Sequence, residues 1–244
     1  MSTPAIDFNY ERFSFDLEDE ELARWLHAGP KRGEPAPDFN LPDINGRMVR
    51  LSDLRGRPVV IEFGAYTCPI FSDRVPAMEK LASEHPEVTF LVIYTREAHP
   101  GEVTGPHRSQ ADKNAAARRM AKEENLSRRV LVDDFDGSVL RAYGGAWNPM
   151  YVVGHDGTLV VRRAWNDPKD VEAALTAMRV RETPGVADSI DMVREPGRAP
   201  IGLRLLQRGG RQALLDFFNS APQPMQHRLL TSPSAEVRLA LGAE

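Results

Sequence analysis

The feature that most constrains the fold is an apolar strand that runs directly into a helix start. Residues 58–63 have the sequence PVVIEF, a short apolar run typical of a buried strand. A turn over 64–67 follows, and then come Cys68 and Pro69. Proline suits the first position of a helix, where no hydrogen-bonded N–H is lost. The pattern therefore predicts a strand, a turn and a helix that begins at Cys68.

Cys68 is the only cysteine of the chain. A sulfur at a helix start faces unpaired N–H groups and the positive end of the helix dipole, and both stabilise the thiolate. We therefore expect Cys68 to be a partly accessible redox or nucleophilic cysteine at the carboxyl end of the strand. The alternative is a buried cysteine that acts as a small hydrophobic side chain. Because no intramolecular disulfide can form, we expect a reducing, cytoplasmic compartment.

The composition excludes several classes of protein. Of the 244 residues, 41% are hydrophobic and 27% are charged, as in soluble globular proteins. The net charge of −4 and the lack of a basic stripe argue against a nucleic-acid partner. Apolar runs such as 88–94 are too short to cross a bilayer, and the first residues lack the pattern of a secretory signal. We therefore expect no membrane association.

The chain divides into three expected parts. Residues 1–35 form an N-terminal extension and linker that contains an amphipathic helix over 18–26. Residues 36–181 form an α/β domain. Residues 182–244 form a C-terminal appendage with helical patches at 203–206, 213–218 and 235–241, whose apolar face must pack on the core or on a partner.

Strands and helices alternate within the central part. A hairpin over 39–50 turns at Asn45-Gly46. The expected strands that follow are 58–63, 89–95, 130–133, 150–153 and 158–161, and the expected helices are 69–85, 108–126, 138–143 and 171–180. This order predicts a mixed central sheet with helices on both faces.

Several segments resemble the thioredoxin-like redoxins. They are Ala36-Pro37-Asp38-Phe39, the LSDLRG sequence at 51–56, and the FGAYTCP sequence at 63–69. Asn148-Pro149, just before the strand at 150–153, matches the place where thioredoxin folds keep a cis-proline that faces the active site. The resemblance therefore implies a thioredoxin-like fold, with Pro149 cis and opposite Cys68, where it would shape the substrate groove.

A sharper resemblance is to the iodothyronine deiodinases, and it covers roughly residues 36–180. It rests on the segments 63–71, 90–100, 106–109, 142–145 and 150–153. The sequences Glu-Ala-His-Pro at 97–100 and His-Arg-Ser at 107–109 are its most specific parts. The resemblance implies that Cys68 stands where the family usually has selenocysteine, and that Glu97, His99 and His107 belong to the active site. Tyr66 departs from the small residue or cysteine that the family often has there.

Each residue near Cys68 has a possible catalytic role and a purely structural alternative. Thr67 can donate a hydrogen bond to the thiolate or cap the helix. His99 and His107 titrate near neutral pH and can deliver a proton. The alternative for each histidine taken alone is a loop or surface residue without a catalytic role. Glu97 either orients His99 or shares its proton, or it is a solvated acid at the end of a strand. A metal site formed by Cys68, Glu97 and the two histidines is disfavoured because they lack the close paired spacing of zinc ligands.

Three further residues are expected to line the substrate pocket: Tyr66, Pro149 and Trp147. For Tyr66 and Trp147 the alternative is simple packing in the core. A deep apolar slot beside Cys68 would favour an aromatic substrate, and a tight polar one would favour a peroxide.

With no second cysteine, the oxidised sulfur needs an external reductant. We expect a small thiol or a thioredoxin-type protein, or Cys68 of a second subunit in a homodimer, and no bound cofactor. Three functions remain open. The first is a thiol oxidoreductase that deiodinates a small aromatic molecule, and the second is a one-cysteine peroxidase that reduces hydroperoxides. The third is a non-enzymatic redox-sensing or partner-binding module.

Overall fold

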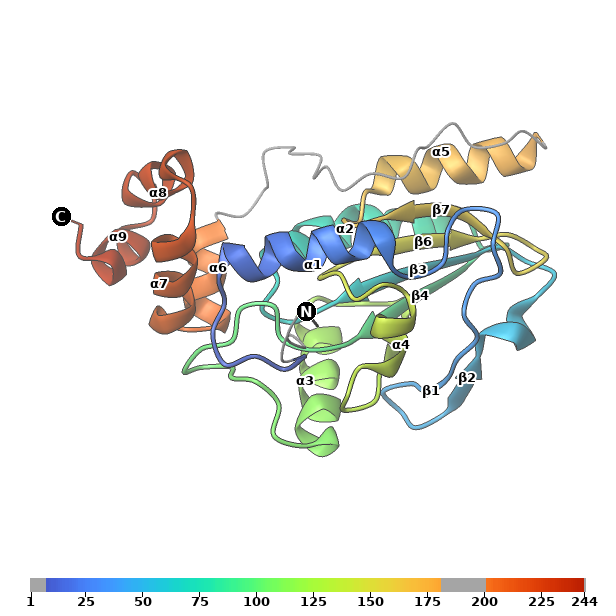
Figure 1. Ribbon diagram of the computed structural model, residues 1–244, viewed down its shortest axis with the longest axis horizontal. Helices are drawn as coiled ribbons and strands as arrows, with labels where there is room; N and C mark the ends of the chain where they lie inside the picture. Colours follow the sequence, from blue (N-terminus) through green and yellow to red (C-terminus); the bar gives the residue numbers. More distant parts are fainter. Residues whose placement is uncertain (1–7, 181–200, 244) are drawn as a thin grey trace.

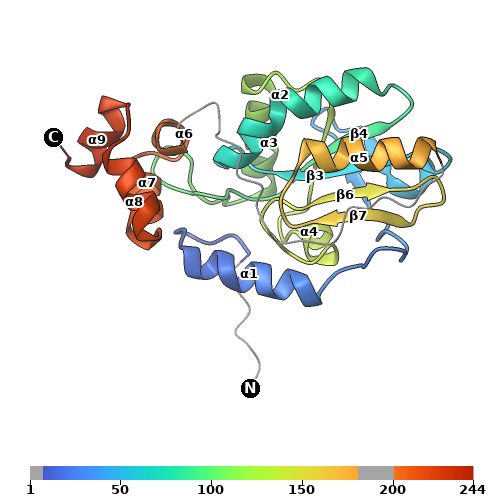
Figure 2. The ribbon, with the colours of Figure 1, turned by 90° about the horizontal axis from the view of Figure 1, so that it is seen from above.

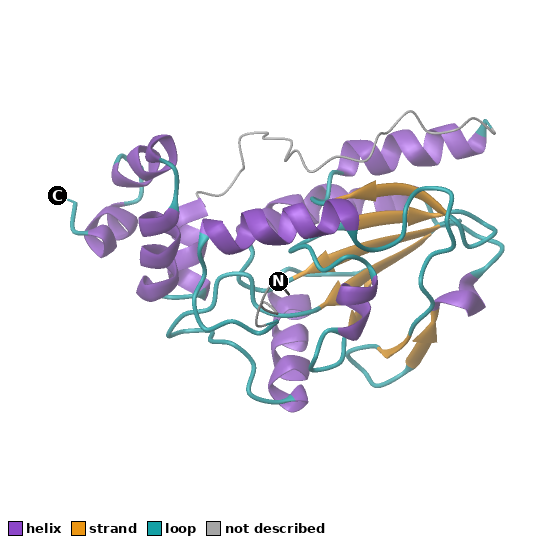
Figure 3. Cartoon of the chain, viewed as in Figure 1, coloured by secondary structure: helices purple, strands orange, loops and turns teal. Residues whose placement is uncertain are grey.

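The fold is built around a five-stranded mixed sheet, seen in a computed structural model that describes residues 8–180 and 201–243 (Figures 1 and 3). The strand order is β5-β4-β3-β6-β7; β3, β4 and β5 run parallel, while β6 is antiparallel to both β3 and β7. The elements in chain order are α1 (Phe15–His27), β1 (Asn40–Pro42), β2 (Met48–Arg50), the 3₁₀ turn η1 (Leu51–Leu54), β3 (Val59–Gly64), α2 (Pro69–Glu84), β4 (Thr89–Tyr94), α3 (Gln110–Glu123), β5 (Arg129–Val132), α4 (Ser138–Ala142), β6 (Met150–Val153), β7 (Leu159–Arg163), α5 (Pro168–Arg179), α6 (Ile201–Arg208), α7 (Arg211–Ser220), α8 (Gln223–Leu230) and α9 (Ala235–Leu241).

Successive residues of β3 point to opposite faces of the sheet, and each face has its own helices. Val60 packs in a core with residues of α2 and α5, whereas Ile61 packs in a core with α4 and the β1–β2 hairpin. Helix α3 packs beside α2, against residues of β4 and β5 (Figure 2). The sheet is therefore covered on both faces, and the expected thioredoxin-like architecture is confirmed.

Most expected elements are present within a few residues of their predicted ends. The hairpin turns at Asn45-Gly46, where Gly46 takes a φ of +84° that favours glycine. Helix α8 was not expected, because its sequence QPMQHRLL is polar and contains Pro224. That proline is tolerated because it lies in the first turn of the helix. No helix in the described ranges is long and apolar enough to span a bilayer.

Helix α1 packs on the central sheet, and the C-terminal helices pack beside it against α1 and α2. Helix α1 buries Trp25, whose Nε1 donates to the Tyr151 hydroxyl at 2.8 Å and whose ring lies 3.7 Å from the Arg162 guanidinium. Helices α6–α9 gather at the end of the sheet where β3 leads into α2 (Figures 1 and 2). The boundary expected at 181–182 lies outside the described residues, so the division into three parts stays a prediction.

A buried ionic cluster ties the sheet to its surroundings. Glu62 of β3 is fully buried; one of its carboxylate oxygens pairs with Arg128 and the other accepts from Asn166. Arg128 also donates to Glu79 of α2 at 2.7 Å. Because a buried carboxylate is stable only when its charge is compensated, Arg128 holds this cluster together.

Replacing Arg128 with methionine should therefore destabilise the protein. Arg128→Met leaves the Glu62 charge buried without its cation, at an expected cost of about 3–5 kcal/mol in the free energy of unfolding, measured by urea denaturation. The control Glu84→Gln breaks the exposed Lys80–Glu84 pair, in which Nζ and Oε1 are 3.6 Å apart, and should cost less than about 0.5 kcal/mol. Equal losses in the two variants would contradict this account of the cluster.

Candidate active site around Cys68

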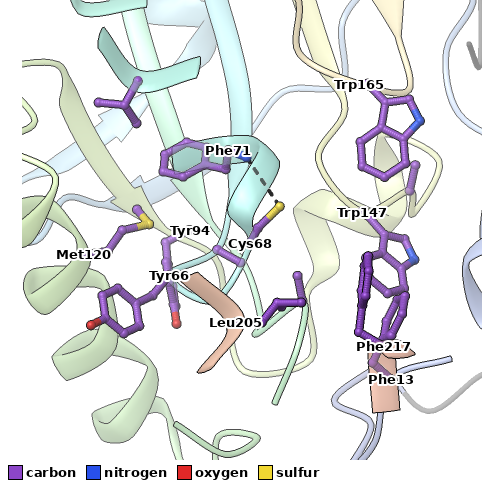
Figure 4. Packing of buried hydrophobic residues seen from close by; sticks show 14 of the residues in the cluster. Phe13, Tyr66, Cys68, Phe71, Tyr94, Met120, Trp147, Trp165, Leu205 and Phe217 are labelled. Carbon is purple, nitrogen blue, oxygen red and sulfur yellow. Dashed lines mark hydrogen bonds between the residues drawn. The ribbon is translucent and has the colours of Figure 1, made fainter. Parts of the chain in front are cut away.

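Cys68 lies where the sequence predicts it, between the end of β3 and the first turn of α2. It is the N-cap residue of α2, and its Sγ accepts a hydrogen bond from the Phe71 N–H at 3.4 Å (Figure 4). Gly64 makes the approach possible, because a Cβ there would lie 2.5 Å from the Phe71 ring. The expected placement of the sulfur at a strand end and helix start is confirmed.

The expected accessibility and charge of the sulfur are wrong. Cys68 is only 2% exposed. Burial raises its pKa to about 12, although donors at the sulfur, the Phe71 and Ile70 N–H groups and the Asn148 amide, oppose this shift. Desolvation of an anion outweighs the helix start, so Cys68 is a neutral thiol at neutral pH.

Asn148, rather than Pro149, faces the sulfur. Its Nδ2 donates to Cys68 Sγ at 2.9 Å. The expectation of a cis Pro149 is wrong, because the described residues contain no cis peptide bond and the trans form is the preferred one even before proline. The Pro149 carbonyl instead accepts from the Phe63 N–H at 3.0 Å and extends the pairing of β6 with β3.

A hydrogen-bonded chain starts one residue before the sulfur. Thr67 donates to Glu97 Oε2 twice, from its N–H at 2.8 Å and from its hydroxyl at 2.6 Å. The Tyr94 hydroxyl donates to Glu97 Oε1 and lies 3.0 Å from His107 Nε2. The expected bond from the Thr67 hydroxyl to the sulfur is wrong, because Glu97 takes that hydrogen.

Burial also sets the protonation of the acid and the histidines. It raises the pKa of Glu97, and it lowers the pKa of His99 to about 3. The pKa of His107 falls to about 4, through burial and the nearby charge of Lys113. The expectation that the two histidines titrate near neutral pH is wrong, because a dry site penalises the imidazolium. Of the three side chains, only Glu97 has a pKa shifted in the direction that favours its protonated form.

A small apolar cavity of about 40 Å³ lies against the sulfur. It is bounded by α1, by the core around Cys68, and by the C-terminal helices. In Figure 4 Trp165, Trp147, Phe217 and Phe13 are grouped on one side of Cys68, while Phe71, Tyr66 and Tyr94 lie on the other. The lining residues are Phe15, Glu18, Cys68, Pro69, Ile70, His99, Trp147, Trp165, Ile201, Phe217 and Met225.

The cavity includes some predicted residues and leaves out others. Trp147 and His99 line it, whereas Tyr66 and Pro149 do not. The Tyr66 hydroxyl instead donates to Glu123 at 2.6 Å, on the far side of the turn. Sequence reasoning missed Asn148 and the wall formed by the C-terminal helices. Asn148 had a signal, its place beside Pro149.

Two nitrogens at the cavity lack partners. His99 Nδ1 and Trp147 Nε1 are buried and find no hydrogen-bond partner among the described residues. Their rings lie 5.7 Å apart. Buried polar atoms are normally satisfied, so a mainly apolar cavity whose lining includes these two nitrogens and Glu18 suits a ligand that carries a polar group. In the described part of the chain no three His, Cys, Asp or Glu side chains could share a metal ion.

The buried neutral histidines make stability depend on pH. Below about pH 6.5 the unfolded chain binds protons at His99 and His107 that the folded chain excludes, so the free energy of unfolding falls as pH falls. From pH 7 to pH 5 each such histidine should cost about 2 kcal/mol. Urea denaturation of His99→Gln should show about that much less acid sensitivity. His155→Gln, on an exposed turn, should keep the sensitivity of the original protein; the same behaviour in both variants would contradict the assignment.

Comparison with known proteins identifies the family of the chain. The iodothyronine deiodinase family model matches residues 22–163. The type II iodothyronine deiodinase of Bos taurus is 36% identical over 127 residues, which are 45% of this chain and 47% of that protein. The thyroxine 5-deiodinase of Sparus aurata is 35% identical over 134 residues, half of each chain. The chain thus spans about half the length of these relatives.

A solved structure supports the fold alone. An uncharacterized conserved protein from Geobacillus kaustophilus superposes with a TM-score of 0.55 at 22% identity, over 65% of this chain and 87% of that one. The matched segment 22–163 contains β3, the Cys68 turn, Glu97 and both site histidines. It covers more than half of the sequence. The chain therefore belongs to the iodothyronine deiodinase family.

Proposed function

We propose that this protein is a thiol oxidoreductase that removes iodine from a small aromatic molecule, with Cys68 as the attacking group. The observation that carries the proposal is the placement of the Cys68 sulfur in an apolar, aromatic-lined cavity next to the Glu97 hydrogen-bonded chain. An aromatic ring suits aromatic walls. The named activities of the two relatives point to the same class of reaction.

The first step transfers iodine to sulfur. The thiol loses its proton, the sulfur attacks iodine, and an S–I bond forms as the C–I bond breaks. The electron pair of that bond stays on the aryl carbon, which takes a proton. One proton leaves the thiol and one reaches the carbon, so the step is neutral overall. A buried site favours a step in which both proton transfers occur, because the site then gains no net charge.

Glu97 is the group best suited to carry the proton. Its pKa is raised, whereas those of His99 and His107 are too low for either to hold a proton at neutral pH. Neutral His107 can donate its Nε2 proton to the Tyr94 oxygen while the Tyr94 hydroxyl donates to Glu97. The hydrogen bonds thus form a chain from His107 through Tyr94 and Glu97 to Thr67, the residue before Cys68.

Two external thiols restore Cys68. The first attacks the Cys68 sulfur, expels iodide and leaves a mixed disulfide; the second releases Cys68 and departs as a disulfide. Two thiols are thus oxidised for each C–I bond reduced. Because Cys68 is buried, a small thiol fits better than a thioredoxin-type protein or Cys68 of a second subunit. A single cysteine used in this way suits a reducing compartment such as the cytoplasm.

Cys68→Ser should abolish iodide release, because a serine hydroxyl does not form the anion that attacks iodine. The assay measures iodide from an iodinated phenol with excess small thiol, beside consumption of a hydroperoxide under the same conditions. The original protein should release iodide in a thiol-dependent way. Hydroperoxide consumption without iodide release would replace this proposal with the one-cysteine peroxidase. Inactivity in both assays would leave a non-enzymatic module.

Glu97→Gln should lower kcat for iodide release by about 100-fold, the usual scale for loss of a general acid. The amide keeps the size of the side chain but cannot carry the proton. Glu123→Gln is the matched control, because Glu123 also accepts from a tyrosine hydroxyl but takes no part in the chain that links Thr67, Glu97 and Tyr94. It should leave kcat within about twofold. Equal rates in the two variants would remove Glu97 from the proton path.

A further inference from the structure

The C-terminal helices α6–α8 complete the wall of the Cys68 cavity. Ile201 of α6, Phe217 of α7 and Met225 of α8 all line it. These helices lie beyond residue 163, where the match to the family model ends. The wall therefore lies outside the segment that the family model matches.

Charged side chains hold these helices against the core. Arg208 donates to the Tyr66 carbonyl at 2.8 Å and to Ser72 Oγ at 2.6 Å, and it pairs with Glu124. On the opposite side, Asp216 pairs with Arg12, just before α1. The Tyr66 and Ser72 contacts flank Cys68 in sequence, so Arg208 fixes α6 directly over the helix start that holds the sulfur.

Glycines bring the same helices close to the His99 loop. A Cβ on Gly209 would lie 2.8 Å from the His99 carbonyl, and one on Gly101 would lie 2.2 Å from the Gly209 carbonyl. The Val103 N–H donates to that carbonyl at 3.1 Å. Backbone contacts this close leave no room for side chains, so the turn between α6 and α7 is packed tightly against the loop that carries His99.

The wall limits what can reach the sulfur. A cavity of about 150 Å³ holds a benzene ring, and the space at Cys68 is about 40 Å³. One ring can enter only if part of the wall moves, and two linked rings need much more. Ile201 is 38% exposed and Met225 is half-buried at the rim, so these side chains can move, and methionine adapts readily. Phe217, packed against Phe13, is fixed.

We propose that Phe217 and Met225 set the size limit of the substrate, and that this site takes a single-ring halogenated aromatic and excludes the two linked rings of an iodothyronine. The inference rests on the proposed function for the reaction, but the size limit itself is a property of access to Cys68. It makes the C-terminal helices a specificity element of the site.

The single cysteine gives a direct test of access. Cys68 is modified in the folded protein and in urea with a small reagent, methyl methanethiosulfonate, which forms a methyl disulfide, and with a bulky one, N-phenylmaleimide, which alkylates the sulfur. In the folded protein the ratio of small to bulky rates should exceed the ratio in urea by at least about tenfold. Met225→Ala and Phe217→Ala should reduce this excess. Leu239→Ala, 73% exposed on α9, should leave it unchanged.

Iodide release provides the second readout. The original protein should act on 4-iodophenol and hardly on a diiodothyronine, and Met225→Ala should raise the relative rate with the two-ring compound by about tenfold. A ratio of small-reagent to bulky-reagent rates that equals the ratio in urea, or that Met225→Ala does not change, overturns the size limit. A ratio that behaves as expected without iodide release from either compound overturns the proposed function and leaves the size limit standing. If Phe217→Ala fails to fold, the Met225→Ala variant alone still tests the size limit.

Discussion

Removal of the Cys68 sulfur from water is the constraint on which the rest of the site depends. Three donors converge on the sulfur and would favour a thiolate, but desolvation outweighs them and the pKa rises to about 12. The same dryness raises the pKa of Glu97 and keeps both histidines neutral. Burial thus disfavours charge on the sulfur and on both histidines at rest, and in the proposed reaction the Glu97 chain redistributes protons.

The terminal additions create this dryness. A thioredoxin-like core places a cysteine at the exposed edge of its sheet, where a helix start would ordinarily activate it. Here Phe15 of α1 and Phe217 of α7 close over that edge, and Arg208 anchors the closure beside the turn that carries Cys68. In the proposed reaction the core supplies Cys68 and the Glu97 chain, and the additions limit what reaches them.

The sequence predicts the core well because its signals are local. An apolar strand before Cys68-Pro69 leaves few alternatives, and the motifs at 97–100 and 107–109 identify Glu97, His99 and His107 without any three-dimensional information. Long-range contacts are a different matter. Nothing near Cys68 shows that residues beyond 200 cover it, so both its exposure and its ionisation were mispredicted. The Thr67 hydroxyl was expected to donate to the Cys68 sulfur or to cap the helix, and only the fold shows that it donates to Glu97.

Titration of the Cys68 thiol tests this account most directly. Thiolate absorbance near 240 nm, taken as the difference between the original protein and Cys68→Ser, reports the ionisation of this one sulfur. The account predicts no thiolate signal up to about pH 9 in the folded protein, and a signal near the ordinary thiol pKa of about 8.5 once urea unfolds it. A folded protein whose sulfur ionises near pH 7 would contradict the buried, neutral site and restore the picture of an exposed, helix-activated thiolate.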